Sequence, residues 1–96
     1  MRLSEQQLQA IKESVSKELT QAEIFLYGSR VDDDKRGGDI DLLVYSEAPV
    51  NLMLKTKIKS KIKQKIGDQK LDIQFLKSGE TNAFVELVKS EAIKLQ

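Results

Sequence analysis

Apolar residues recur at helical spacing near the start of the chain. They stand three or four positions apart and therefore fall on one face of a helix. These residues are Leu8, Ile11, Val15 and Leu19. Ser4, followed by Gln7 three positions later, has the form of a capping box, which marks a helix N-terminus. The pattern predicts a first helix from about Glu5 to Leu19.

Three shorter segments are typical of β-strands. Residues 24–27 form an apolar run that ends at Gly28. Residues 39–45 alternate at first and then become continuously apolar, as a strand does where both of its faces are covered. Residues 71–76 alternate between apolar and polar positions. All three are too short for buried helices, so we predict three strands.

The polar stretch between the first two strands, residues 31–38, predicts an exposed loop with room for one helical turn. It contains three consecutive aspartates, Asp32, Asp33 and Asp34. Adjacent acidic residues in an exposed loop usually remain solvated, so we do not expect a separate metal site there.

Residues 50–66 carry two competing periodicities. Apolar residues recur every four positions, at Leu54, Ile58, Ile62 and Ile66. Lysines recur every two positions, at Lys55, Lys57, Lys59, Lys61, Lys63 and Lys65. A strand would separate the two sets, but the segment is about three times the usual strand length of roughly 5–6 residues. We therefore predict a helix that ends at Gly67, with an apolar arc of about 120° flanked by lysines.

A final helix is expected over about 82–95. Its apolar positions are Phe84, Leu87, Val88 and Leu95, with Ala92 between them, and we expect Leu87, Val88 and Leu95 to join the core. The resulting order, α-β-β-α-β-α, predicts an α/β (α+β) fold in which helices pack against a small mixed β-sheet. At 96 residues, the chain has room for one domain, residues 1–96.

The amino-acid composition limits the kinds of reaction and metal site that the chain can support. The chain has no cysteine and no histidine, which removes thiolate metal sites, Cys nucleophiles and the usual neutral-pH base. The net charge of +1 gives no general support for a nucleic-acid or membrane partner. The polar N-terminus and the lack of a run of about 20 apolar residues lead us to expect a cytoplasmic protein. Chemistry must rest on carboxylates, Ser, Lys and Arg.

The clearest candidate site contains paired aspartates. Asp39 and Asp41 are two residues apart at the start of a strand, so their side chains leave the same face with Cα atoms about 7 Å apart. Such carboxylates repel one another unless a cation lies between them, and Mg²⁺ takes oxygen ligands of this kind. The turn at Gly28-Ser29 offers amide groups and a hydroxyl to phosphate oxygens. Asp72 would complete a site for two metal ions about 3.5–4 Å apart if its strand lies alongside.

These motifs resemble the nucleotidyltransferases of the DNA polymerase beta superfamily, specifically the minimal nucleotidyltransferase (MNT) domains. The signature combines a small-residue pair, a spacer of about ten residues, an Asp-x-Asp motif and a later carboxylate. Here Gly28-Ser29 is followed by the spacer 30–38, then Asp39-Ile40-Asp41, then Asp72. The resemblance covers about residues 24–76. The spacer departs from the family pattern because it carries aspartates where many members have a glycine.

The resemblance implies roles for each residue. Gly28 and Ser29 would bind the phosphates of ATP or another NTP, and Arg30 would orient the loop or contact phosphate. Asp39 and Asp41 would ligate Mg²⁺. Asp72 would complete the two-metal site and help to activate the attacking hydroxyl.

The resemblance also implies a setting. Minimal members are commonly paired with a helical HEPN-type toxin, and some transfer AMP from ATP onto a tyrosine of that toxin. An antitoxin that neutralises its toxin by binding alone is the main alternative. Binding of RNA through the lysine-rich segment is less favoured, because no aromatic residues are interleaved for base stacking. The amphipathic helices leave homo-oligomers open.

Overall fold

The first helix begins where its capping box predicts. The computed structural model describes residues 3–31, 39–67 and 69–96. In α1 (Glu5–Glu18), the hydroxyl of Ser4 accepts the N–H of Gln7 at 3.0 Å, and the N–H of Ser4 donates to Oε1 of Gln7 at 3.0 Å. Both bonds satisfy groups that the first helical turn otherwise leaves unpaired, so α1 starts at Glu5.

Four strands form one mixed sheet. They are β1 (Glu23–Tyr27), β2 (Ile40–Ser46), β3 (Leu71–Lys77) and β4 (Ile93–Lys94). Their spatial order is β3-β2-β1-β4. β1 runs antiparallel to β2 and to β4, and β2 runs parallel to β3. The predicted small mixed sheet with helices packed against it is confirmed.

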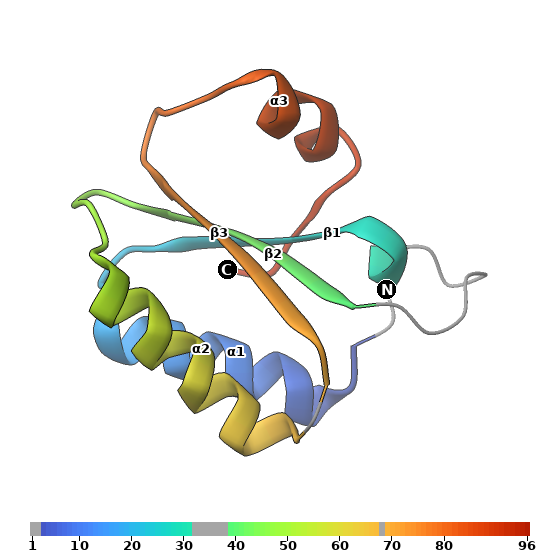
Figure 1. The fold of residues 1–96 in the computed structure, drawn as a ribbon. Helices are drawn as coiled ribbons and strands as arrows, with labels where there is room; N and C mark the ends of the chain where they lie inside the picture. The colour runs from blue at the N-terminus through green and yellow to red at the C-terminus, as the bar shows by residue number, and fades with distance from the viewer. Residues whose placement is uncertain (1–2, 32–38, 68) are drawn as a thin grey trace.

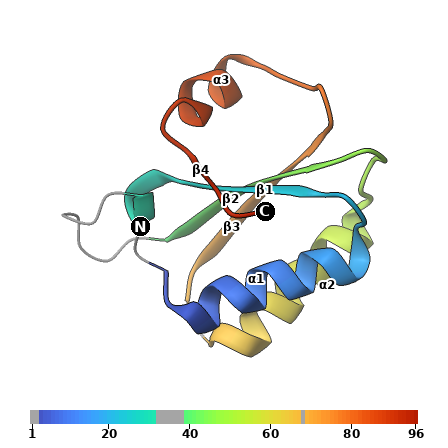
Figure 2. The same cartoon turned by 180° about the vertical axis from the view of Figure 1, so that it is seen from behind.

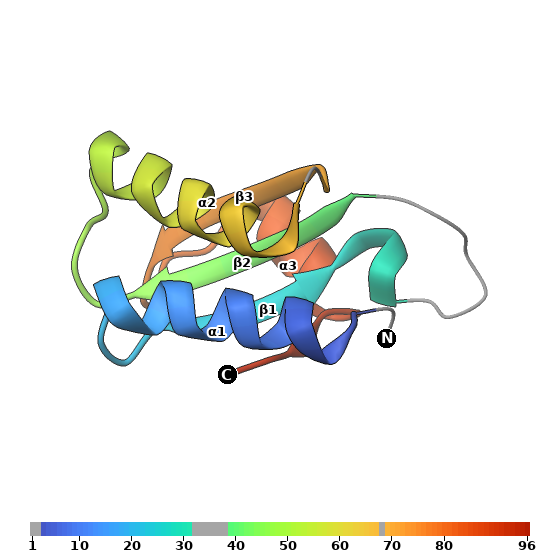
Figure 3. The same ribbon diagram turned by 90° about the horizontal axis from the view of Figure 1, so that it is seen from below.

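The sheet lies between two helical layers. α1 and α2 (Leu52–Ile66) lie side by side across one face, and α3 (Ala83–Lys89) covers the other (Figures 1 and 3). The α1–α2 side holds the larger core, which includes the fully buried Ile11, Ile24, Leu42 and Ile62. The α3 side holds a smaller cluster of Tyr27, Leu43, Tyr45 and Val85. Alternation along β2 divides its residues between the two cores.

The lysine-rich segment is a helix, as predicted. The side chain of Asn51 accepts the N–H of Leu54 at 2.8 Å, which starts α2 at Leu52 rather than at residue 50. Ile58 and Ile62 are fully buried. No helix among the described residues is long and apolar enough to cross a membrane.

The connection after β1 includes a short 3-10 helix, η1 (Gly28–Val31). The sequence predicts one helical turn at most, further along, within the loop over 31–38. From residue 32 to residue 38 that loop lies outside the described residues, and so do the three consecutive aspartates.

The predicted final helix is too long. α3 ends at Lys89, and Figure 2 shows the chain returning from α3 to the sheet as β4. There the N–H of Leu95 donates to the carbonyl of Ile24 at 2.7 Å. The outer edge of β1 offers backbone partners to this segment, and pairing with that edge prevails over helical periodicity.

The core residues of α3 also differ from the prediction. Leu87 is 74% exposed, whereas Val85 is 2% exposed. Val88 is half-buried against the α3-side cluster, and Leu95 packs against the larger core from beyond β4. Once the helix ends at Lys89, Leu95 no longer shares a helical face with Leu87. In the shorter helix, Val85 faces the sheet and packs with Tyr27, Leu43 and Tyr45.

This orientation of α3 predicts a contrast between two alanine substitutions. Val85→Ala removes buried methyl groups and is expected to lower the free energy of unfolding by roughly 1–3 kcal/mol. Leu87→Ala changes an exposed side chain and is expected to stay within about 0.5 kcal/mol of wild type. Urea denaturation of both variants measures the difference. A larger loss for Leu87→Ala would mean that α3 packs through the predicted face instead.

Candidate functional site

The carboxyl end of β1 and the amino ends of β2 and β3 lie together at one end of the sheet, across the strands. Here Asp41 in β2 pairs with Tyr27 in β1 on one side and with Asp72 in β3 on the other. Residues directly opposite each other on neighbouring strands project to the same face. That face is the one under α3, because Tyr27 belongs to the cluster of Val85. The register therefore aligns two carboxylates and a phenol on three adjacent strands.

A left-handed backbone conformation brings the chain against Asp41. Gly28 follows β1 directly and has a φ of 80°. A Cβ atom at this position would lie 2.5 Å from Oδ2 of Asp41, which is closer than real Cβ atoms approach. Glycine meets both demands because it has no Cβ. Ser29 and the half-buried Arg30 follow in η1, so the predicted phosphate-binding segment begins in contact with a predicted metal ligand.

The negative charges at this end of the sheet repel one another. Burial raises the pKa of the Asp41 carboxyl, and the charges of Asp72 and then Asp39 raise it further. Lys70 acts on this pKa in the opposite direction. Burial, followed by the charges of Asp41 and Asp72, also raises the pKa of the Tyr27 hydroxyl. The three aspartates therefore belong to one electrostatic site.

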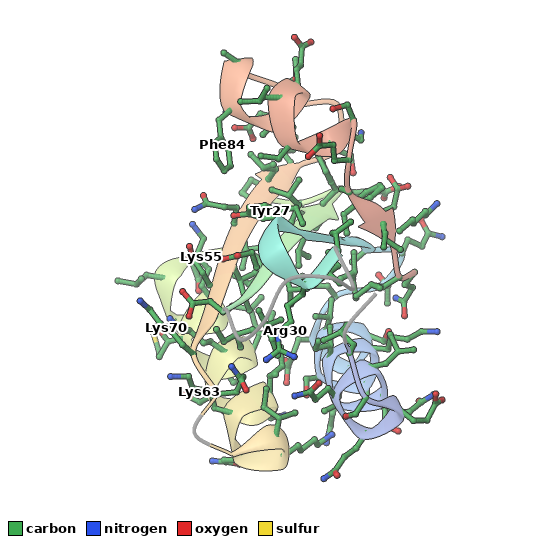
Figure 4. The ribbon with its side chains drawn as sticks, turned by 90° about the vertical axis from the view of Figure 1, so that its right-hand side faces the viewer. Tyr27, Arg30, Lys55, Lys63, Lys70 and Phe84 are labelled. Atoms are coloured by element: carbon green, nitrogen blue, oxygen red, sulfur yellow. The ribbon has the colours of Figure 1, made fainter. Side chains whose placement is uncertain are left out.

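Lys70 places a positive charge at this site. Its Nζ atom lies 3.6 Å from Oδ2 of Asp39. The N–H of Ile40 donates to the carbonyl of Lys70 at 3.0 Å, which ties the residue before β3 to the start of β2. Figure 4 looks onto this end of the sheet and shows Arg30, Lys63 and Lys70 below Tyr27. The ion pair is exposed and contributes little to stability, but it partly offsets the charge of the aspartates.

The residues present fit a hard divalent cation by their chemistry. Asp39, Asp41 and Asp72 offer carboxylate oxygens alone, the donors that Mg²⁺ prefers. A cation would also relieve the repulsion that raises the pKa of Asp41. As the side chains stand, no group of three or more acidic, His or Cys residues within residues 3–31, 39–67 and 69–96 converges closely enough to hold a metal. Joint coordination thus requires the carboxylates to move together.

A cavity of about 710 Å³ opens beside Gly28, between η1 and α3. Its lining residues come from β1, η1, α3 and the turn that follows α3: Tyr27, Gly28, Val31, Leu87, Val88, Ser90 and Glu91. The ring of Phe84 packs edge-on against Tyr27, with centroids 5.8 Å apart (Figure 4). Small-molecule sites usually measure about 300–1,000 Å³. The cavity therefore has room for a nucleotide-sized molecule next to Gly28.

The predicted site residues fall at one place in the fold. Asp41, Asp72 and Gly28 lie at the same end of the sheet, and Asp39 directly precedes β2. Ser29 and Arg30 lie in η1. Their roles as metal ligands and phosphate-binding residues remain predictions.

Tyr27 and Lys70 also belong to this site, although the sequence pattern did not predict them. Because side chains alternate along β1, Tyr27 lies on the face of the sheet opposite to Ile24 and Leu26. Only the strand register shows that Asp41 in β2 pairs with it. Lys70 stands two residues before Asp72, and this spacing was the available signal.

Comparison with known proteins identifies the family. Residues 9–95 match the family model described as polymerase beta, nucleotidyltransferase. The chain therefore belongs to the polymerase beta nucleotidyltransferase family. No curated protein sequence matches the chain significantly.

Solved structures share its fold. A complex of a tri-AMPylated HEPN toxin with its MNT antitoxin from Shewanella oneidensis gives a TM-score of 0.67 at 14% identity, covering 94% of this chain and 69% of the other. A mutant MntA-HpeT toxin–antitoxin complex gives 0.69 at 13% identity, covering 93% and 71%. A protein designated a nucleotidyltransferase gives 0.66 at 28% identity, covering 93% and 97%. The fold is that of MNT domains.

The close approach of Gly28 to Asp41 predicts that a substitution at Gly28 weakens ligand binding in addition to lowering stability. Gly28→Ala is expected to push the Asp41 carboxylate aside and to weaken binding of ATP with Mg²⁺ by at least about tenfold, measured by calorimetry. Its positive φ should also cost roughly 1–2 kcal/mol of unfolding free energy.

Gly79→Ala is the matched control for that substitution. Gly79 has a φ of 87°, but nothing lies within 4 Å of the position of its Cβ. This variant should show a similar loss of stability and unchanged ligand binding. Equal weakening of binding in both variants would contradict a specific role for the contact between Gly28 and Asp41.

Proposed function

We propose that this protein is a Mg²⁺-dependent nucleotidyltransferase that moves AMP from ATP onto a tyrosine hydroxyl of a HEPN-type toxin and thereby acts as its antitoxin. The observation that carries this proposal is the register of Asp41, which lies between Asp72 on β3 and Gly28 at the end of β1. Family membership and the fold support the same reaction class.

The order of the strands separates the two reactants. The cavity beside Gly28 lies on the β1 side of Asp41 and suits the donor nucleotide, with its phosphates against the Gly28-Ser29 turn. Asp72 lies on the β3 side and is exposed. An acceptor hydroxyl that arrives at Asp72 would face the donor across Asp41. This arrangement favours attack and departure on opposite sides of the transferred phosphorus.

The transfer can be written with residues of this chain. The acceptor oxygen forms a bond to the α-phosphorus, the bond from that phosphorus to the bridging oxygen breaks, and pyrophosphate leaves with the electron pair. Asp72 accepts the proton of the acceptor hydroxyl and passes it to water. Asp39 and Asp41 would hold Mg²⁺, which neutralises charge on the phosphates when bound. Lys70 would leave Asp39 as the cation enters.

Two of the structural neighbours support a toxin as the partner. Both are toxin–antitoxin complexes, and in one of them the toxin carries AMP groups. The absence of His and Cys agrees with a reaction that needs positioning and charge neutralisation rather than a protein nucleophile. We place the reaction in the cytoplasm.

Transfer of labelled AMP tests the proposal. The protein is incubated with α-labelled ATP, Mg²⁺ and the product of the neighbouring gene. Wild type is expected to label that protein covalently. Asp39→Asn combined with Asp41→Asn is expected to reduce labelling at least about 100-fold, because the variant loses two metal ligands, while toxin binding persists.

The matched control removes two exposed acids elsewhere, Glu5→Gln with Glu47→Gln, and should label normally. Toxin growth inhibition is scored in parallel. Full neutralisation by the Asp39/Asp41 variant would contradict the enzymatic proposal and support the alternative, an antitoxin that acts by binding alone.

A further inference from the structure

A second depression reaches the site from the opposite side. A groove of about 230 Å³ runs between α2 and β3, the outermost strand of the sheet. Its walls come from the two elements together: Leu52, Lys55, Thr56, Lys59, Asp72, Ile73 and Phe75. Because Asp72 is part of its lining, a molecule in the groove lies beside the proposed acceptor position.

The lysines of α2 divide into two stripes. Lysines at every second position of a helix fall alternately on its two flanks. On one flank, Lys57 and Lys61 pair with Glu18 at 3.2 and 2.9 Å, and Lys65 pairs with Glu13 at 3.3 Å. These pairs join α2 to α1, so this stripe serves the fold.

The other stripe consists of Lys55, Lys59 and Lys63. Within the ranges that the structure describes, none of these three lysines forms an ion pair. Lys55 instead holds its Nζ atom 6.0 Å from the ring centroid of Phe75. Lys55 and Lys63 lie on the side of the molecule that faces the viewer in Figure 4, together with Lys70. Lys55 and Lys59 of this stripe line the groove and give it a positive wall.

The floor of the groove is the edge of a strand. The carbonyl of Lys70 faces β2, whereas the N–H of Lys77 faces away from β2 and donates to Oε1 of Glu80 at 3.0 Å. Backbone groups alternate in direction along a strand, so those of Ile73 and Phe75 face outward like that of Lys77. An edge of this kind can pair with an added extended segment.

We propose that this groove binds an extended acidic segment of the protein that supplies the acceptor hydroxyl. This inference rests on the proposed function and adds the chemistry of the partner. The lysine wall complements the acidic side chains of such a segment, and the β3 edge pairs with the backbone of the segment. Leu52, which lines the groove and is 77% exposed at the outer end of α2, supplies an apolar contact.

RNA fits the groove less well than a peptide. Single-stranded nucleic acid is bound by stacking of bases on exposed aromatic faces. The aromatic residue in the groove, Phe75, is half-buried and has Lys55 over its ring.

Binding of a defined peptide tests the groove. The probe is a fluorescein-labelled nonapeptide that alternates glutamate and valine around a central tyrosine, followed by anisotropy without ATP or metal. Lys55→Glu with Lys59→Glu is expected to weaken binding at least about tenfold. The control, Lys12→Glu with Lys17→Glu on α1, makes the same change in net charge and should stay within about twofold of wild type. Thermal unfolding confirms that both variants fold.

Two N-methylated versions of the peptide test strand addition. Methyl groups on one alternate set of amides remove the hydrogen bonds toward β3, and methyl groups on the other set leave these bonds intact. We expect one version to lose binding and the other to keep it.

Equal binding to all protein variants, absence of peptide binding, or tighter lysine-dependent binding of a twelve-residue oligouridine would overturn the proposal. Equal binding of the two methylated peptides would also overturn it. Because the assay contains no nucleotide or metal, failure of AMP transfer leaves its result intact.

Discussion

The parallel register of β2 and β3 is the constraint on which the site depends. It sets Asp41 directly beside Asp72, on a face where burial already disfavours a charged carboxylate. A shift of one residue would turn one of the two side chains to the opposite face and separate them. The backbone thus holds in proximity two negative charges that would otherwise move apart.

The fold can carry this unfavourable arrangement because its two faces do different work. The α1–α2 face buries a continuous aliphatic core, and most of the apolar burial that stabilises the domain lies there. The α3 face has a smaller cluster and leaves room for polar groups around Tyr27. The site is flanked by two hollows, the cavity beside Gly28 and the groove beside β3. The lysines of α2 likewise divide between ion pairs with α1 and the lining of the groove.

Local patterns predicted most of the elements, whereas pairing between distant segments was harder to foresee. Ser4 and Gln7 marked the start of α1 because a capping box acts within one turn. β4 escaped prediction because its two residues form a strand only where β1 offers an edge. Asp72 could be placed in a strand from alternation, but its neighbour could not, since the period of two does not identify the partner strand. Tyr27 joined the site for the same reason, through register alone.

The pKa of the Asp41 carboxyl, measured by NMR titration in metal-free buffer, tests the central claim most directly. The account predicts a pKa above the ordinary aspartate value, so the folded state loses stability as pH rises through that pKa. In Asp72→Asn the pKa of Asp41 should fall but stay raised, because burial remains after the neighbouring charge is removed. A pKa at or below the ordinary value, or one that Asp72→Asn leaves unchanged, would contradict the juxtaposition of the two carboxylates.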